Sequence, residues 1–235
     1  MGKKYASFNS SGAVVGYYDS TDSPPPSGAD VIEITESQWL AAISSQYPVS
    51  VANGGLVIPS GPNLTQAQTA QKSLVTQGYN SATDYVPVTV NGTTYQVDNT
   101  AGKQALNLSL AITANAAMQS PAWAADTEYA AGQLCSVSGV ILFCSTPGKS
   151  GTSAPTPPTA FGTPVTDGTA AWELMGRKVY LQGGSFVYMT PQQIMSAFQQ
   201  GELYLHQMSD KLELLKSEIM AATTVTEVQT FELLR

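Results

Sequence analysis

The sequence predicts an α+β protein built from three parts. Residues 121–176 contain short strand-like runs that end in aromatic residues and are separated by turn residues, which indicates a small all-β module. The segments before and after this module have helical periodicity and are expected to form one domain, split between residues 63–120 and 177–235. Residues 1–62 read as a small β-rich unit. The β module is therefore expected to be an insert that the helical domain displays.

The N-terminal unit opens with a predicted hairpin at residues 3–19 and a strand at Val31–Ile34. Thr35 and Gln38 form a capping-box pattern, which predicts a short helix that carries Trp39. A second strand pair is expected at residues 49–58, broken at Asn53-Gly54-Gly55.

The helical domain is expected to begin with a weak helix at residues 64–78. Asn91-Gly92 predicts a tight hairpin because both central residues of such a turn need positive φ. A helix is predicted over residues 101–118, and the longest helix should begin at Thr190, with Gln193 completing a second capping box.

The long helix carries an apolar seam that is sustained for about four heptads. Two interpretations remain open: packing against the 101–118 helix of the same chain, or self-association around a symmetry axis as a homotrimer, and both can hold in one bundle. The candidate oligomerisation residues are Ile194, Phe198, Leu205, Met208, Leu212, Leu215 and Ile219.

The charge of the chain argues against nucleic acid as a partner. The formal net charge is -7, from 10 basic and 17 acidic residues, and no basic stripe is visible. The sequence contains no run of about 18 apolar residues, so it does not predict membrane insertion. The N-terminus has two lysines without an apolar segment behind them, so no secretory signal is expected and synthesis should take place in the cytoplasm.

The sequence suggests no catalytic residues, no metal site and no cofactor, so we do not expect an enzyme. The single histidine, His206, lies beside the seam, and one histidine cannot build a multi-histidine site. Gly148-Lys149-Ser150 lacks the first glycine of a phosphate-binding loop. Four acidic residues surround the insert, but Asp167-Gly168 reads as a tight turn rather than as half of a glycosidase pair. The four are Asp126, Glu128, Asp167 and Glu173.

Two cysteines, Cys135 and Cys144, stand on either side of a predicted turn at Gly139-Val140. A turn there would place them opposite each other, within reach of a cross-strand disulfide. Cytoplasmic thiols stay reduced by default, so the disulfide remains an open alternative.

The aromatic residues of the insert are either its core or a surface for sugar rings, whose C–H faces stack on aromatic side chains. The candidate ligand-binding residues are Trp123, Tyr129, Phe143 and Trp172. Phe143 ranks first, because side chains alternate along a strand and Phe143 would be free if Leu142 points into the core.

These patterns resemble proteins of bacteriophage tails. Lys4-Tyr-Ala-Ser-Phe8, Gly16-Tyr-Tyr18 and Glu33 to Trp39 resemble the start of caudovirus tail-fibre assembly and tail-fibre-associated proteins. Val88-Thr-Val-Asn-Gly-Thr-Thr-Tyr-Gln-Val-Asp98 resembles the first half of an uncharacterised C-terminal domain of such phage proteins. Lys178 to Phe186 and Leu212 to Thr224 resemble its second half.

The insert at residues 121–176 is similar to the chitin-binding-like carbohydrate-binding modules of phage fibres, and it splits a domain that the resemblance would make continuous. The resemblance implies a structural component of the virion tail, with other tail or tail-fibre proteins as partners and a host-surface glycan as ligand. The alternative is a tail-fibre assembly chaperone that is not retained in the virion.

Overall fold

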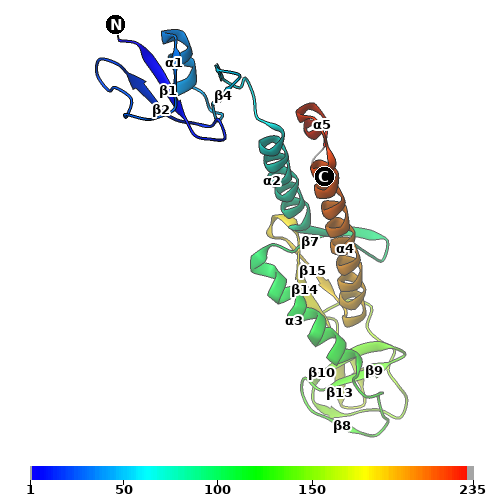
Figure 1. Ribbon diagram of the computed structural model, residues 1–235. Coiled ribbons are helices and arrows are strands. Elements are labelled where there is room, and N and C mark those ends of the chain that lie inside the picture. Colours follow the sequence, from blue (N-terminus) through cyan, green and yellow to red (C-terminus); the bar gives the residue numbers. More distant parts are fainter. Residues whose placement is uncertain (1, 232–235) are drawn as a thin grey trace. The chain divides into compact units, whose positions relative to one another are not determined.

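The computed structural model describes residues 2–231 and shows a mixed α+β protein with several small sheets (Figure 1). The described chain divides into two compact units, residues 2–73 with 218–231 and residues 74–217. The division crosses helices α2 (Leu64–Thr83) and α4 (Pro191–Ala221) rather than falling at residue 62. The insert belongs to the same compact unit as the helical segments on both sides of it.

The first unit begins with a three-stranded antiparallel sheet in the order β2-β1-β3. Its strands are β1 (Lys4–Phe8), β2 (Val14–Asp19) and β3 (Val31–Ile34), and helix α1 (Glu36–Ile43) follows. The predicted capping box is confirmed, since Thr35 and Gln38 satisfy each other's backbone N–H groups. Strands β4 (Ser50–Ala52) and β5 (Gly55–Val57) form the predicted second pair.

The first unit also holds the start of α2 and the end of α4. The Gln68 side-chain amide donates to the backbone carbonyls of Met220 and Ala222, each at 3.2 Å. The last carbonyls of a helix have no partner within the helix, so this buried glutamine caps the C-terminal end of α4. The short helix α5 (Val225–Gln229) follows and buries Val228.

Both halves of the split domain contribute to one apolar core in the second unit. Strands β6 (Tyr85–Val90) and β7 (Thr93–Asp98) pair through the predicted Asn91-Gly92 turn, in which both residues have positive φ. Helix α3 (Ala101–Met118) follows, and after the insert come β14 (Arg177–Tyr180), the turn η1 (Gln182–Gly184), β15 (Phe186–Met189) and the first half of α4. The buried core comprises Val86, Val88, Val90, Val97, Ala114, Val179, Met189, Ile194 and Ala197.

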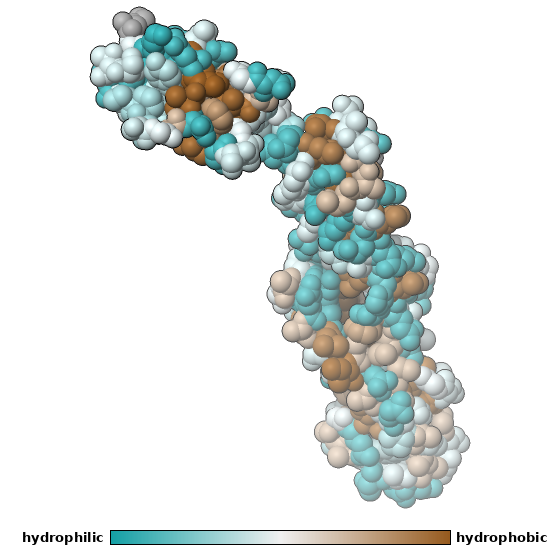
Figure 2. Space-filling view, viewed as in Figure 1, coloured by the Kyte–Doolittle hydropathy of each residue, from teal (hydrophilic) through white to brown (hydrophobic). Residues whose placement is uncertain are grey.

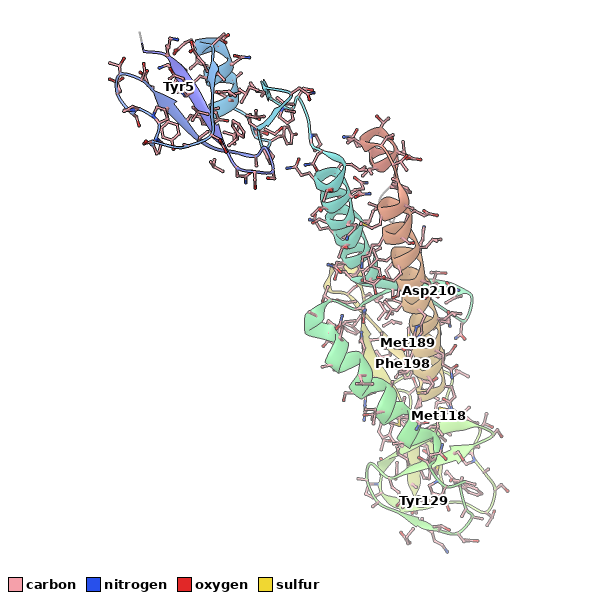
Figure 3. All side chains as sticks on the ribbon, in the orientation of Figure 1. Tyr5, Met118, Tyr129, Met189, Phe198 and Asp210 are labelled. Atoms are coloured by element: carbon pink, nitrogen blue, oxygen red, sulfur yellow. The ribbon has the colours of Figure 1, made fainter. Side chains whose placement is uncertain are left out.

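The insert is a four-stranded antiparallel sheet in the order β12-β13-β10-β9, with a two-stranded ribbon beside it. The sheet consists of β9 (Leu134–Val137), β10 (Val140–Thr146), β12 (Val165–Asp167) and β13 (Ala170–Leu174). The ribbon pairs β8 (Glu128–Tyr129) with β11 (Gly148–Lys149). The insert follows directly on α3, whose last residue, Met118, is labelled in Figure 3.

The seam of α4 is largely used within the single chain. Four of the seven candidate oligomerisation residues are buried and three are half-buried. The partner is not the 101–118 helix alone, since the core around Ile194 also contains side chains of β6, β7 and β14. The buried four are Ile194, Met208, Leu212 and Ile219; the half-buried three are Phe198, Leu205 and Leu215. These buried side chains are not available to a symmetry-related copy.

Two leucines on α4 test this arrangement. Leu212 is 6% exposed and Leu214 is 59% exposed. Leu212→Ala should lower the free energy of unfolding by about 2–5 kcal/mol because it opens a cavity in the core. Leu214→Ala should change it by less than about 0.5 kcal/mol. Urea unfolding followed by circular dichroism measures both, and equal losses would contradict the burial of the seam within the chain.

Candidate functional site

A buried carboxylate connects the segments of the insert. One oxygen of Asp167 accepts hydrogen bonds from the indole nitrogens of Trp123, at 2.8 Å, and Trp172, at 3.0 Å. The other accepts the backbone N–H of Gly151 at 2.8 Å. Hydrogen bonds to an ionised acceptor are about twice as strong as neutral ones, so this single side chain joins three distant stretches of a small module.

The turn that carries Asp167 is tight, as predicted. Gly168 has φ +66, and a Cβ there would lie 2.3 Å from the carbonyl oxygen of Lys149. No other residue type fits this close approach, because a side chain would collide with the backbone of the neighbouring loop. The other acidic residue with a defined partner in the insert, Asp126, forms an exposed ion pair with Lys149 at 3.2 Å.

Two of the four candidate ligand-binding rings are core residues. Trp172 is 0% exposed and Tyr129 is 5% exposed, and their rings meet edge to face with centroids 4.7 Å apart. A buried ring offers no face to a sugar, so a ligand-binding role for Tyr129 and Trp172 is contradicted (Tyr129 is labelled in Figure 3). Trp123 is half-buried against the same core, with its indole nitrogen bound to Asp167.

Phe143 occupies the second face of β10. The predicted alternation is correct: Leu142 lies in the core of the insert, and Ile141 shares the opposite face with Phe143. That opposite face is not free, however. Phe143 packs against a cluster that contains Ala117 of α3 and Met175. The expectation that Phe143 is free to meet a partner is therefore wrong, because the helical domain supplies a second core for this face.

The two cysteines are free and buried. The hairpin turns at Ser138-Gly139, both with positive φ, and pairs Cys135 with Leu142 rather than with Cys144. The one-residue difference from the predicted turn places the thiols diagonally across the ladder. Burial, with smaller contributions from Cys144 and Asp167, raises the pKa of the Cys135 thiol to about 11. Cys135 is therefore protonated at neutral pH and is a packing residue rather than a nucleophile.

A hollow of about 500 Å³ in the second unit lies between α3, α4 and the β6–β7 hairpin. Valines of β6 and β7 form its floor, and Asn99, Gln104 and Asn107 contribute amides at its margin. Glu202 is its one charged lining residue. This hollow has no arrangement of groups for acid–base or nucleophilic chemistry.

Exposed aromatic residues gather at a place that the sequence reasoning did not identify. The rings of Phe186 and Tyr188, on β15, have centroids 5.8 Å apart, and Phe161 of the insert lies 5.6 Å from Tyr188. The Lys178 ammonium lies 4.4 Å from the centre of the Phe186 ring. The alternation of Phe186 and Tyr188 was a signal in the sequence, but it did not tell which face of the strand is solvated.

We call this set of four residues, Phe161, Lys178, Phe186 and Tyr188, the aromatic face. Within residues 2–231, no group of three or more His, Cys, Asp or Glu side chains is placed to hold a metal ion. The helices of the described chain also include none that is long and apolar enough to cross a bilayer. The three rings of the aromatic face are 36–47% exposed, and this face is the candidate binding site.

Comparison of the chain with known protein families, with curated proteins and with solved structures finds no match.

Substitutions of two aspartates test the role of the buried carboxylate. Asp167→Asn keeps the shape of the side chain but replaces one acceptor oxygen with an amide group, which leaves either the Gly151 N–H or both indole N–H groups unpaired. We expect a loss of about 1–3 kcal/mol in the free energy of unfolding. Asp126→Asn, at the exposed ion pair, should cost at most about 1 kcal/mol. Thermal unfolding followed by tryptophan fluorescence measures both losses. If Asp167→Asn did not lower the free energy of unfolding, the proposed role of the buried carboxylate would be contradicted.

Proposed function

We propose that the chain is a structural component of a bacteriophage tail that presents a host-binding surface at the junction of its insert and its helical domain. The observation that carries this proposal is the way in which the insert is mounted. Ile141 and Phe143 of β10 pack in one apolar cluster with Ala117 near the end of α3. The module is thereby fixed to its support.

Further contacts support a rigid mount. The Gln192 side chain, at the start of α4, donates to the carbonyl of Gly139 in the β9–β10 turn at 2.6 Å. The insert is thus fastened to α3 through apolar packing and to α4 through a hydrogen bond. Such a mount suits a display module, because binding then loses little entropy in ordering the module relative to its support.

The second candidate function is that of a tail-fibre assembly chaperone. The observation that favours it lies in the N-terminal part of the first unit, where apolar residues gather on the surface (Figure 2). Leu40 and Ile43 of α1 are both about half exposed. An exposed apolar surface of this kind fits a protein partner, whether transient in assembly or permanent in a tail.

Protein mass spectrometry of purified phage particles distinguishes the two candidates. A tail component should be present in constant ratio to the other tail proteins and remain after high-salt washing. A chaperone should be found in the lysate of infected cells but not in the particles. Absence from washed particles would overturn the proposed function, and the presence of a known tube or baseplate protein in the same sample is the control for recovery.

We further propose that the chain self-associates as a trimer through α3 rather than through the α4 seam. Helix α3 carries a single charged residue, Lys103, and exposes Leu108 and Ile112. Two copies of a chain with a net charge of -7 repel each other, so a nearly uncharged helix face is the surface on which they can meet at least cost.

Sedimentation analysis of two matched variants tests this surface. Ile112→Lys should dissociate the oligomer while the chain keeps its helical circular dichroism, because Ile112 is 62% exposed and a lysine there meets water in the folded monomer. Thr113→Lys, on the next exposed position of the helix, should leave the mass unchanged. A monomeric unaltered protein, or an Ile112→Lys protein that keeps its mass, would contradict association through α3.

A further inference from the structure

The hairpin of β14 and β15 has one buried face and one aromatic face. Its register pairs Lys178 with Tyr188 and Tyr180 with Phe186, so these four side chains lie on the same face. The other face carries Val179 and Met189 into the core of the second unit. The solvated face of an antiparallel ribbon normally carries polar residues. Here Phe186 is 47% exposed and Tyr188 is 43% exposed, which calls for a partner that covers the rings.

The insert completes this face. Phe161, in the loop between β11 and β12, places its ring beside Tyr188 and directly over the backbone of Gly176. A Cβ at Gly176 would lie 2.3 Å from the Phe161 ring, so the ring can pack against this backbone only because residue 176 has no side chain. The aromatic face therefore exists only when the insert is packed on its host, since each contributes part of it.

A polar groove of about 270 Å³ adjoins the aromatic face. Phe161 and Tyr188 form one part of its wall, and hydroxyl and amide side chains form much of the rest, with no charged residue in the lining. Besides Tyr188, the polar lining residues are Asn91, Thr93, Tyr95, Thr159, Thr190 and Gln193. Neutral hydroxyls and amides beside exposed rings fit a ligand that has both hydroxyl groups and C–H faces, which describes a saccharide better than an apolar peptide.

The charge around the aromatic face is opposite to that of the chain as a whole. No acidic residue occurs between Glu173 and Glu202, and Lys178 lies on the aromatic face itself. Lys103 of α3 adds a second cation, 3.9 Å from the centre of the ring of Tyr180, which lies on the same face of the hairpin. In a chain with a net charge of -7, this local excess of positive charge favours an anionic ligand.

We propose that the aromatic face and the adjoining groove bind an acidic glycan, a saccharide chain that carries uronate or phosphate groups. Phe186 and Tyr188 stack on sugar rings, Lys178 pairs with an anionic substituent, and the groove takes the hydroxyl groups of the next sugar. This proposal names the ligand class of the host-binding surface, and its role in attachment to the host rests on the proposed function. Binding is measured on the isolated chain, so its failure is distinguishable from absence of the protein from phage particles.

Isothermal titration of the full chain with a defined panel tests the proposal. The probes are hexagalacturonate, a phosphate-bearing teichoic-acid fragment, and maltohexaose as the neutral oligosaccharide. At least one acidic probe should bind, more weakly at high salt, and maltohexaose should bind less tightly. Phe186→Ala and Tyr188→Ala should each weaken that binding about tenfold or more. Their melting temperatures should stay close to that of the unaltered chain, since both rings are exposed.

Matched lysine variants separate the charge from the rings. Lys178→Gln should weaken binding of the acidic probe and leave any binding of maltohexaose unchanged, whereas Lys211→Gln, on the exposed surface of α4, should alter neither. The proposal is overturned if no acidic probe binds or if the ring variants bind as the unaltered chain does. It is also overturned if Phe186→Ala instead lowers the mass in sedimentation, since the rings would then be covered by another copy.

Discussion

Strand β10 is buried on both faces, and the arrangement of the second unit depends on this constraint. Leu142 and Cys144 point into the core of the insert, while Ile141 and Phe143 point into a second core shared with Ala117 of α3. A strand with two apolar faces cannot sit at the surface of a small module without exposing one of them. The insert is therefore not a freely tethered domain but part of the same packed unit as the helices beside it.

The same constraint decides which rings can meet a ligand. Within the insert, Asp167 holds two indoles in place, and the rings of Trp172 and Tyr129 fill the core. A module this small needs most of its large apolar side chains to build its own core. Rings are exposed to a ligand where the insert meets the hairpin of β14 and β15. One face of that hairpin packs on the core of the second unit, so its other face is not needed for packing.

The sequence predicts most of the local structure, because local structure depends on short-range chemistry. The Asn91-Gly92 hairpin and the capping boxes at Thr35 and Thr190 form as expected. Helix α2 runs past Gly78 to Thr83, since packing outweighs the cost of one glycine. Phe143 was expected on a free face of its strand, and that expectation failed because of contacts with residues far away in the sequence. The continuous run Val140 to Cys144 is typical of a strand buried on both faces, but what covers the second face is fixed by contacts far away in the chain.

Native-state hydrogen exchange tests most directly whether insert and host form one rigid unit. The amides of β10 and β13 and those in the last turns of α3 should exchange with the same free energy of opening, because breaking the shared cluster of Ile141, Met175 and Ala117 exposes both sides. The result that would contradict this account is exchange of residues 121–176 through a separate opening of lower free energy, while α3 and β15 stay protected. The insert would then be an independent domain, and the aromatic face would not be a fixed surface.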